Sequence, residues 1–201
     1  MARFESMYVN ICILFISTIF FNDIRIYLMS YRQNDNKKTI PFILILLIAV
    51  IISLLVKIFI FDLVKISGSS MEPTLKNSRI VLVNKLAYGI VKPFTSEFII
   101  QWKEPQTNDI VIFLHDNKMY VKRVVAEESF PLEFYADSEY SLKIGEKLIP
   151  LTESQFKNLA GYSTVPENTV LAIGDNYSTS IDSRNFGFVS VKNVIGKVVC
   201  I

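Results

Sequence analysis

The chain has 201 residues, of which 51% are hydrophobic, and its formal net charge is +2. A chain of this length can hold one domain of ordinary size together with one or two apolar spans. The composition is too apolar for a disordered protein, and the small charge excludes the large basic excess typical of nucleic-acid-binding proteins. We therefore expect no nucleic-acid partner.

Histidine and cysteine are scarce in this chain. Cys12 and Cys200 lie near opposite ends, and His115 is the only histidine. Metal sites need several such ligands at short, regular spacing, which this sequence lacks. We therefore expect no metal, no other cofactor and no disulfide within the chain.

The first predicted element is an apolar run over residues 7–21. Asn10 interrupts it, and an extension toward a full span would include Asp23 and Arg25. About 20 apolar residues are needed to cross the hydrocarbon core of a bilayer. Residues 1–39 therefore hold either a first transmembrane helix or an interfacial helix, followed by a basic cytoplasmic loop. A cleaved signal peptide is disfavoured because no small-x-small cleavage site follows the run.

A second apolar run covers residues 40–61 and predicts a transmembrane helix. Residues 40–56 carry no charge, and Lys57 lies close enough to one end to reach the membrane interface. Because positive residues stay on the cytoplasmic side, this helix runs outward and residues 62–201 lie on the extracytoplasmic face of the cell membrane. The only positively charged residue of the N-terminal tail is Arg3, whereas the loop before the helix holds Arg25, Arg32, Lys37 and Lys38.

Beyond residue 61 the long apolar runs give way to short segments rich in β-branched and aromatic residues. Such segments are typical of strands, and the turn-forming residues between them favour antiparallel pairing. We predict a mostly β domain over residues 62–201, built as an antiparallel sheet or a barrel-like arrangement. The apolar segment 90–102 would either dip into the membrane interface or form a core-facing edge. The predicted strands are residues 79–83, 109–114, 119–126, 169–173 and 194–201.

Residues 127–166 have a looser pattern than the rest of the predicted domain. An acidic stretch is followed by a hairpin pattern over residues 140–149 and a short helix pattern over residues 154–160, which Gly161 ends. The segment is too short to bury a core of its own. We interpret it as a lid-like insertion.

Two short stretches, SGSSMEPTL at residues 67–75 and YVKRV at residues 120–124, offer a serine nucleophile and a lysine base. A serine hydroxyl attacks a carbonyl only when a base lies within hydrogen-bond reach. His115 lies in a polar cluster between two predicted strands, so we expect it in a solvated turn, and a Ser-His-Asp triad is disfavoured. A lysine acts as a base only after burial lowers its pKa, and the apolar neighbours of Lys122 suit that role.

These two stretches belong to a longer series of motifs. The chain also contains RIVLVNKLAYG at residues 79–89, NDIVIF at residues 108–113 and GDNYSTSIDSRNFGF at residues 174–188. Their order resembles that of the bacterial type I signal peptidases, from roughly residue 64 to the C-terminus. The resemblance implies that family's β-rich catalytic domain behind a membrane anchor. It leaves residues 129–166 unmatched, and the chain departs from the family pattern where VAEES follows YVKRV.

The resemblance implies a Ser-Lys catalytic dyad. The nucleophile is the serine immediately before the Met-x-Pro-Thr pattern, which is Ser70, and the general base is Lys122. Ser69 is the nearest competing serine. Gly68 would let the backbone approach the scissile carbonyl, with the Ser70 N–H as an oxyanion donor. A second oxyanion donor is left open, because some members carry a serine where this chain has Gly68.

The GDNYSTSIDSRNFGF motif holds the supporting residues that the resemblance implies. Asp182 resembles the family's structural acid, which would pair with Arg123 and secondarily with Arg184. Ser180 resembles the residue that orients the lysine ammonium, and Asp175 is expected to brace the turn. From the residues alone, these charged side chains would equally form an ordinary surface ion-pair cluster.

The implied activity is hydrolysis of one peptide bond, at the end of the signal peptide of an exported preprotein, by a membrane-bound serine endopeptidase. By the family's pattern, Ile66 and Val121 would line shallow apolar pockets that suit a small-x-small cleavage site. The expected partners are signal-peptide-bearing preproteins and the lipid bilayer. One alternative is a Ser-Lys peptidase dedicated to a single substrate. Another is a catalytically inactive, membrane-anchored preprotein-binding protein, which would be expected to lose Ser70 or Lys122.

Overall fold

The computed structural model describes residues 39–92, 98–137 and 139–200. The chain divides into two compact units, one within residues 3–57 and the other within residues 58–201. The predicted first span over residues 7–21 lies outside the described residues.

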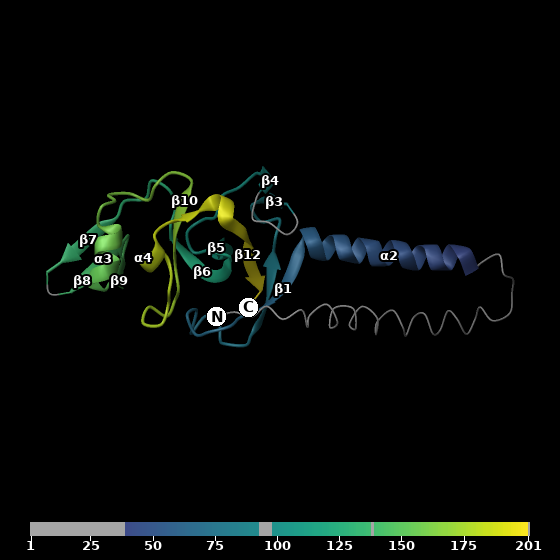
Figure 1. Ribbon diagram of the computed structural model, residues 1–201, viewed down its shortest axis with the longest axis horizontal. Helices are drawn as coiled ribbons and strands as arrows, with labels where there is room; N and C mark the ends of the chain where they lie inside the picture. The colour runs from purple at the N-terminus through teal and green to yellow at the C-terminus, as the bar shows by residue number, and fades with distance from the viewer. Residues whose placement is uncertain (1–38, 93–97, 138, 201) are drawn as a thin grey trace. The chain divides into compact units, whose positions relative to one another are not determined.

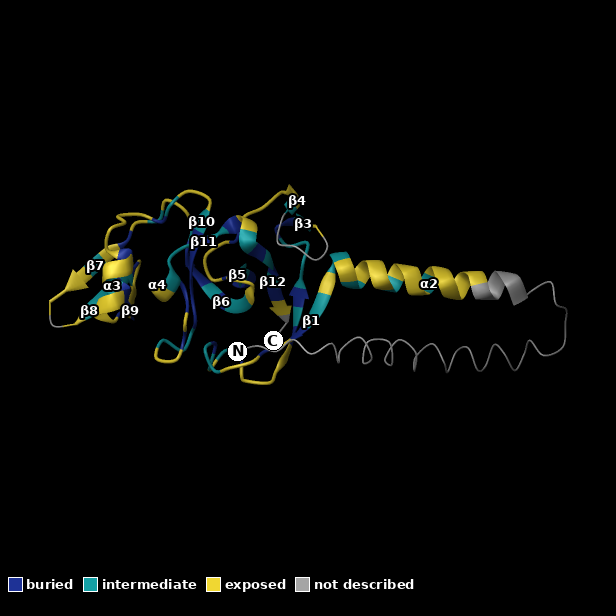
Figure 2. Ribbon diagram, viewed as in Figure 1, coloured by how far each residue is buried: buried dark blue, intermediate teal, exposed yellow. Residues whose placement is uncertain are grey.

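The described part of the first unit consists of residues 39–57 of helix α2 (Thr39–Phe59). Large apolar side chains are exposed along it from Leu44 to Ile58, and the ribbon of this helix is coloured mostly as exposed in Figure 2. The helix predicted over residues 40–61 therefore forms, and it ends at Phe59. In the part of the chain that the structure describes, no helix is long and apolar enough to cross a membrane.

The second unit is built on a seven-stranded sheet in which every strand pairing is antiparallel (Figure 1). The strand order is β1-β2-β12-β5-β6-β10-β11. The predicted mostly β, antiparallel domain is thus confirmed. The strands are β1 (Phe61–Lys65), β2 (Ile80–Asn84), β5 (Ile110–His115), β6 (Lys118–Ala126), β10 (Thr169–Ile173), β11 (Val189–Ser190) and β12 (Val194–Cys200).

A tight hairpin sets the register at the centre of this sheet. Asp116 and Asn117 connect β5 to β6 with φ values of 48° and 57°. Two successive residues with positive φ are typical of the turn whose twist matches antiparallel strands, and asparagine and aspartate tolerate it best. The turn pairs His115 with Lys118, which places Lys122 opposite Val111. Lys122 therefore lies on a strand that is flanked on both sides.

Buried apolar residues form three clusters against the sheet, and Figure 2 colours the buried parts of its strands dark blue. One cluster joins Ile66, Met71 and Leu75 from the segment after β1 to the apolar residues of β2 and β5. A second contains Tyr88, from the segment after β2, together with Phe113 and other residues of β5, β6 and β10. Because Met71 and Leu75 are 1% and 0% exposed, burial of their side chains holds the serine-containing segment against the sheet.

The insertion forms a three-stranded sheet and a helix that pack on the main sheet. Its elements are β7 (Glu133–Ala136), β8 (Tyr140–Ile144), β9 (Lys147–Pro150) and α3 (Glu153–Leu159). The predicted hairpin over residues 140–149 and helix over residues 154–160 therefore form. Leu142, Ile149 and Leu159 share one apolar cluster with Leu171 and Ile173 of β10.

Smaller elements complete the unit. The ribbon of β3 (Gly89–Val91) and β4 (Phe98–Gln101) leaves Ile99, Ile100 and Trp102 exposed. A core-facing edge is therefore ruled out for these three side chains, although Phe98 packs against the core. Helix α4 (Ser183–Phe186) and the 3-10 helix η1 (Val191–Asn193) lie between β10 and β12 in the sequence.

Candidate active site

The structure brings Ser70 and Lys122 together. Lys122 Nζ donates a hydrogen bond to Ser70 Oγ over 2.7 Å. Lys122 is only 3% exposed because its strand lies inside the sheet, and Ser70 directly precedes the buried Met71. This geometry places a base within the reach that a serine nucleophile requires.

The surroundings of Lys122 favour its neutral form. Burial lowers the pKa of its ammonium from 10.5 to about 8, an effect that Arg184 reinforces and that the carboxylates of Asp182 and Asp175 oppose. With such a pKa, roughly a tenth of the lysine is neutral at pH 7, compared with less than a thousandth for an ordinary lysine. Lys122 can therefore accept the Ser70 proton near neutral pH.

Asn176 anchors the backbone of the serine segment, and it was missing from the predicted site residues. Its N–H donates to the Ser70 carbonyl over 3.0 Å, and its Nδ2 donates to the Ser69 carbonyl over 3.2 Å. The available signal was its place in the GDNYSTSIDSRNFGF motif, next to Asp175. A side-chain amide suits this task because it can donate to a carbonyl while its backbone N–H donates to another.

Gly174 lets the two loops approach each other. A Cβ atom at Gly174 would lie 2.2 Å from Ser180 Oγ and 2.4 Å from the Ser70 carbonyl oxygen. Real Cβ atoms do not come this close to other atoms, so only glycine fits without movement.

We predict that Gly174→Ala lowers the kcat of any Ser70-dependent cleavage by about a hundredfold, because the added methyl would displace the Ser70 backbone and a misplacement of about 1 Å costs about this much. The rate is measured on a purified preprotein, and the fold is checked by circular dichroism. Gly161→Ala is the matched control, since a Cβ at Gly161 meets nothing within 4 Å. Equal rates for the two variants would contradict the role assigned to Gly174.

Ser180 does not take its predicted place. Its Oγ is buried and has no hydrogen-bond partner among the described residues, so it does not bond to the Lys122 ammonium. The hydroxyl lies instead beside Gly174. Ser180 thus lies near the active-site loop, as predicted, but the hydrogen bond of the Lys122 ammonium goes to Ser70.

Arg123 pairs with Asp175, and the predicted pairing with Asp182 is wrong. Arg123 Nε and Nη2 donate to the two carboxylate oxygens of Asp175 over 2.8 and 2.7 Å. The register of the sheet explains the choice. Ile173 of β10 lies opposite Arg123, so Asp175, two residues further on, comes alongside the guanidinium.

Asp182 and Arg184 form a separate, fully buried pair. Arg184 Nε and Nη2 each donate to a carboxylate oxygen of Asp182 over 2.9 Å, and the two residues are 0% and 1% exposed. Asp182 also caps α4 by accepting the Arg184 N–H, and its Oδ2 accepts the Gly174 N–H over 3.0 Å. A surface ion-pair cluster is therefore excluded for this pair, which holds the loop beside Ser70.

The conformation of the backbone, rather than a lack of space for a side chain, favours glycine at position 68. Its φ is +99°, which favours glycine, whereas a Cβ there would meet nothing within 4 Å. Its N–H donates to Asn77 Oδ1 over 3.1 Å. Ile66 and Val121, the predicted pocket residues, lie in or against one apolar cluster with Met71, beside the dyad.

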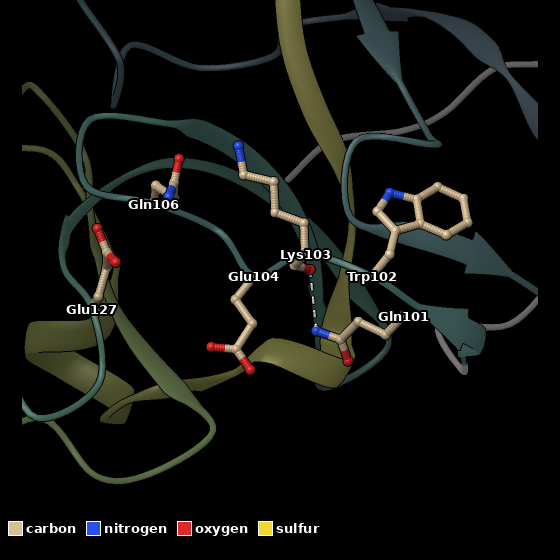
Figure 3. Close-up of a pocket in the computed structure, with 6 residues that line it drawn as sticks. All are labelled: Gln101, Trp102, Lys103, Glu104, Gln106 and Glu127. Carbon is tan, nitrogen blue, oxygen red and sulfur yellow. Dashed lines mark hydrogen bonds between the residues drawn. The ribbon is translucent and has the colours of Figure 1, made fainter.

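His115 is not the solvated turn residue that was predicted. It ends β5, and its ring stacks on Phe186 of α4 with the ring centroids 4.1 Å apart. In the described residues, no group of three or more histidine, cysteine, aspartate or glutamate side chains could hold a metal ion. The polar pocket in Figure 3 contains none of the predicted site residues, and it is lined by Gln101, Trp102, Lys103, Glu104, Gln106 and Glu127.

A family model and individual relatives of this chain point to the same protein family. The family model described as signal peptidase, peptidase S26, matches residues 39–128 and 134–201. A signal peptidase I of Bacillus caldolyticus is 30% identical over 168 residues, covering 75% of this chain and 84% of the relative. A signal peptidase I of Buchnera aphidicola is 28% identical, covering 75% of this chain and 72% of the relative.

Two further relatives complete the comparison. An inactive signal peptidase IA of Staphylococcus aureus is 26% identical, covering 81% of this chain and 90% of the relative. A crystal structure of a signal peptidase I from Enterococcus faecalis has 25% identity, covers 48% of this chain and 98% of its own, and has a TM-score of 0.35. The family model extends over well over half of the residues, including Ser70 and Lys122. This chain belongs to the signal peptidase family, peptidase S26.

Proposed function

We propose that this protein is a membrane-anchored serine endopeptidase that removes signal peptides from exported preproteins, with Ser70 as nucleophile and Lys122 as general base. The observation that carries the proposal is the 2.7 Å hydrogen bond from a buried lysine to a serine hydroxyl. Membership of the signal peptidase family supports the substrate class.

The reaction follows from the proton positions in the dyad. Neutral Lys122 takes the proton of Ser70 Oγ as that oxygen attacks the scissile carbonyl. The resulting oxyanion accepts a hydrogen bond from the Ser70 N–H, the role proposed for that backbone group. Protonated Lys122 then gives its proton to the departing amine, which leaves an ester on Ser70. Neutral once more, Lys122 removes a proton from the water that hydrolyses this ester.

Anchoring by the N-terminal segment is part of the proposal. The exposed apolar side chains of α2 and the basic residues that precede it support insertion with the β domain on the extracytoplasmic face. The exposed Ile99, Ile100 and Trp102 of the β3–β4 ribbon also suit a lipid interface, because an indole combines an apolar ring with a polar N–H. Confinement to one bilayer would raise the effective concentration of substrate at the dyad.

The proposal is tested by cleavage of a purified preprotein with a small-x-small site in detergent, over a pH series. We expect kcat/KM to rise with pH along a limb centred at about 8, because burial lowers the Lys122 pKa to that value and only the neutral amine is a base. A limb near the ordinary value for lysine, or no pH dependence, would contradict Lys122 as the base.

Two variants complete this test. Ser70→Ala is expected to remove cleavage, whereas Ser69→Ala is expected to cleave normally, because the Ser69 hydroxyl makes only a long, exposed bond to Thr179 Oγ1 over 3.4 Å and its backbone carbonyl still accepts from Asn176. Loss of cleavage in Ser69→Ala together with activity in Ser70→Ala would reassign the nucleophile.

A non-cleaving preprotein-binding protein is the second candidate, and the inactive Staphylococcus aureus relative is the observation that favours it. The hydrogen bond between Lys122 and Ser70 argues for the enzyme. If folded wild-type protein binds a preprotein but cleaves neither it nor other small-x-small substrates, the binding role is favoured. Cleavage of only one among many preproteins would favour a dedicated peptidase.

A further inference from the structure

The side chain of Gln155 joins two helix N-termini that belong to different parts of the domain. As the third residue of α3, it completes the capping box of that helix: its Oε1 accepts the Thr152 N–H over 2.9 Å, and its own N–H donates to Thr152 Oγ1 over 3.3 Å. Its Nε2 donates to Asn185 Oδ1 of α4 over 3.3 Å. Gln155 is 8% exposed, so a single buried amide serves both the insertion and α4.

The oxygen that Gln155 contacts has a second task. Asn185 Oδ1 also accepts the Asp182 N–H over 3.3 Å, which completes the capping box of α4. A helix of four residues has few internal backbone bonds, so its N-terminus depends on this box. By donating to the same oxygen, Gln155 holds the Asn185 side chain in its capping orientation.

The cap of α4 leads directly to the serine. Asp182 Oδ2 accepts the Gly174 N–H over 3.0 Å. Two residues along this loop, the Asn176 N–H donates to the Ser70 carbonyl over 3.0 Å. A continuous series of hydrogen bonds and one short loop thus connects Gln155 to the backbone of Ser70.

A second tether runs beside the first. Asn158 Nδ2 donates to the carbonyls of Arg184 and Asn185 over 3.3 and 3.2 Å. The insertion therefore contacts both ends of α4 through amide side chains of α3.

We propose that Gln155 is a positioning residue through which the insertion holds the loop of residues 174–176, and with it Ser70, in place for catalysis. The inference rests on the proposed function of Ser70 and adds a role for the insertion. Gln155 does not touch the reacting atoms. It acts through Asn185, Asp182 and Gly174.

The test uses Gln155→Glu in the full chain. The glutamate has the same shape and keeps the oxygen that caps α3, but an acceptor replaces the Nε2 donor and faces Asn185 Oδ1. Lys157→Gln is the matched control: it lies on the same helix, changes the charge by the same amount, and lies on the exposed side, where its partner is Glu153.

Two kinetic changes are expected for Gln155→Glu on a preprotein. The kcat falls by about tenfold with KM unchanged, because the serine is misplaced while the substrate contacts remain. The rising limb of the pH profile moves to higher pH, because loosening of α4 lets water reach Lys122 and weakens the burial that lowers its pKa. The charged groups that act on the Lys122 pKa are Asp182, Arg184 and Asp175. The control Lys157→Gln changes the net charge by the same amount and so shows how far the change of charge alone moves the limb.

A merely structural role would leave a different trace. A smaller folded fraction lowers the rate without moving the midpoint of the pH limb to the ordinary lysine value, and it appears as a lower thermal midpoint of unfolding. If Gln155→Glu cleaves like Lys157→Gln, or loses rate without a shift of the limb, the proposal is overturned.

A readout without activity separates this proposal from the proposed function. Amide hydrogen exchange over residues 174–186 is expected to accelerate in Gln155→Glu and not in Lys157→Gln, because the caps of α4 and Gly174 loosen. If the wild type cleaves nothing, the proposed function fails, and this exchange comparison still decides whether Gln155 holds the loop. If Gln155→Glu does not fold, Asn158→Ala replaces it, because Asn158 is exposed and its substitution leaves the core of the domain intact. Unchanged amide exchange over residues 174–186 in Asn158→Ala would then overturn the proposal that the insertion holds this loop.

Discussion

Replacement of Lys122 by methionine is expected to reduce cleavage by about 10⁴-fold and at the same time to raise the stability of the domain. Methionine keeps the length of the side chain but cannot accept the Ser70 proton. The gain in stability follows from burial, because the folded protein holds Lys122 at a pKa of about 8 instead of 10.5. A difference of this size corresponds to a cost of about 3 kcal/mol for the charged lysine.

The pH dependence of this gain has a definite sign. The folded-state pKa is below the unfolded value, so the unfolded chain binds more protons between about pH 8 and 10.5, and wild-type stability rises with pH across that window. The advantage of Lys122→Met is therefore largest at pH 7 and vanishes above pH 10.5. Urea unfolding followed by circular dichroism at the two ends of this range measures it. A variant no more stable than wild type at pH 7 would show that Lys122 is not strained by burial.

The second large effect is expected for Arg184→Met, which leaves the fully buried Asp182 carboxylate without its partner. Loss of one member of a buried ion pair costs about 3–5 kcal/mol. Arg184 also donates to the Tyr177 and Pro150 carbonyls, so the loop beside Ser70 and the insertion lose contacts together. We expect the thermal midpoint to fall by about 10 °C.

Two controls define this result. Asp182→Asn combined with Arg184→Met should recover part of the stability, because the buried charge is removed along with its partner. Lys157→Met, which breaks an exposed ion pair with Glu153, should leave the thermal midpoint unchanged. A midpoint for Arg184→Met equal to that of wild type would contradict the dependence of the buried Asp182 carboxylate on Arg184.

Strands with a clear apolar pattern were predictable from the sequence, whereas short or charged strands were not. The strand predicted over residues 169–173 has the same bounds as β10, because its uninterrupted apolar residues are buried at the centre of the unit. In contrast, β1 was not predicted, since its residues 61–65 continue the apolar run of α2 and contain two charges. β11 has only two residues, which is too short for any periodicity. Such strands exist because of their partners, which the local sequence does not reveal.

The charged residues of the site show the same limit. Arg123, Asp175, Asp182 and Arg184 were all identified as supporting residues, yet Arg123 was assigned to the wrong carboxylate. Both carboxylates lie in one short motif, and their spacing along the chain cannot distinguish them. The register between β6 and β10 selects Asp175 for Arg123, while capping of α4 keeps Asp182 beside Arg184.

By itself, the sequence determined the kind of residues available for chemistry: serines in a glycine-containing segment, a lysine among apolar neighbours, and no histidine in a suitable place. It also determined a β-rich domain after an apolar segment, because hydrophobic periodicity is a local property. The family resemblance already pointed to Ser70 rather than Ser69 as the partner of Lys122, whereas only the tertiary structure decided that Ser180 does not bond to Lys122 and that the insertion is tied to α4 through Gln155. These contacts join residues far apart in the chain, so strand register and packing determine them.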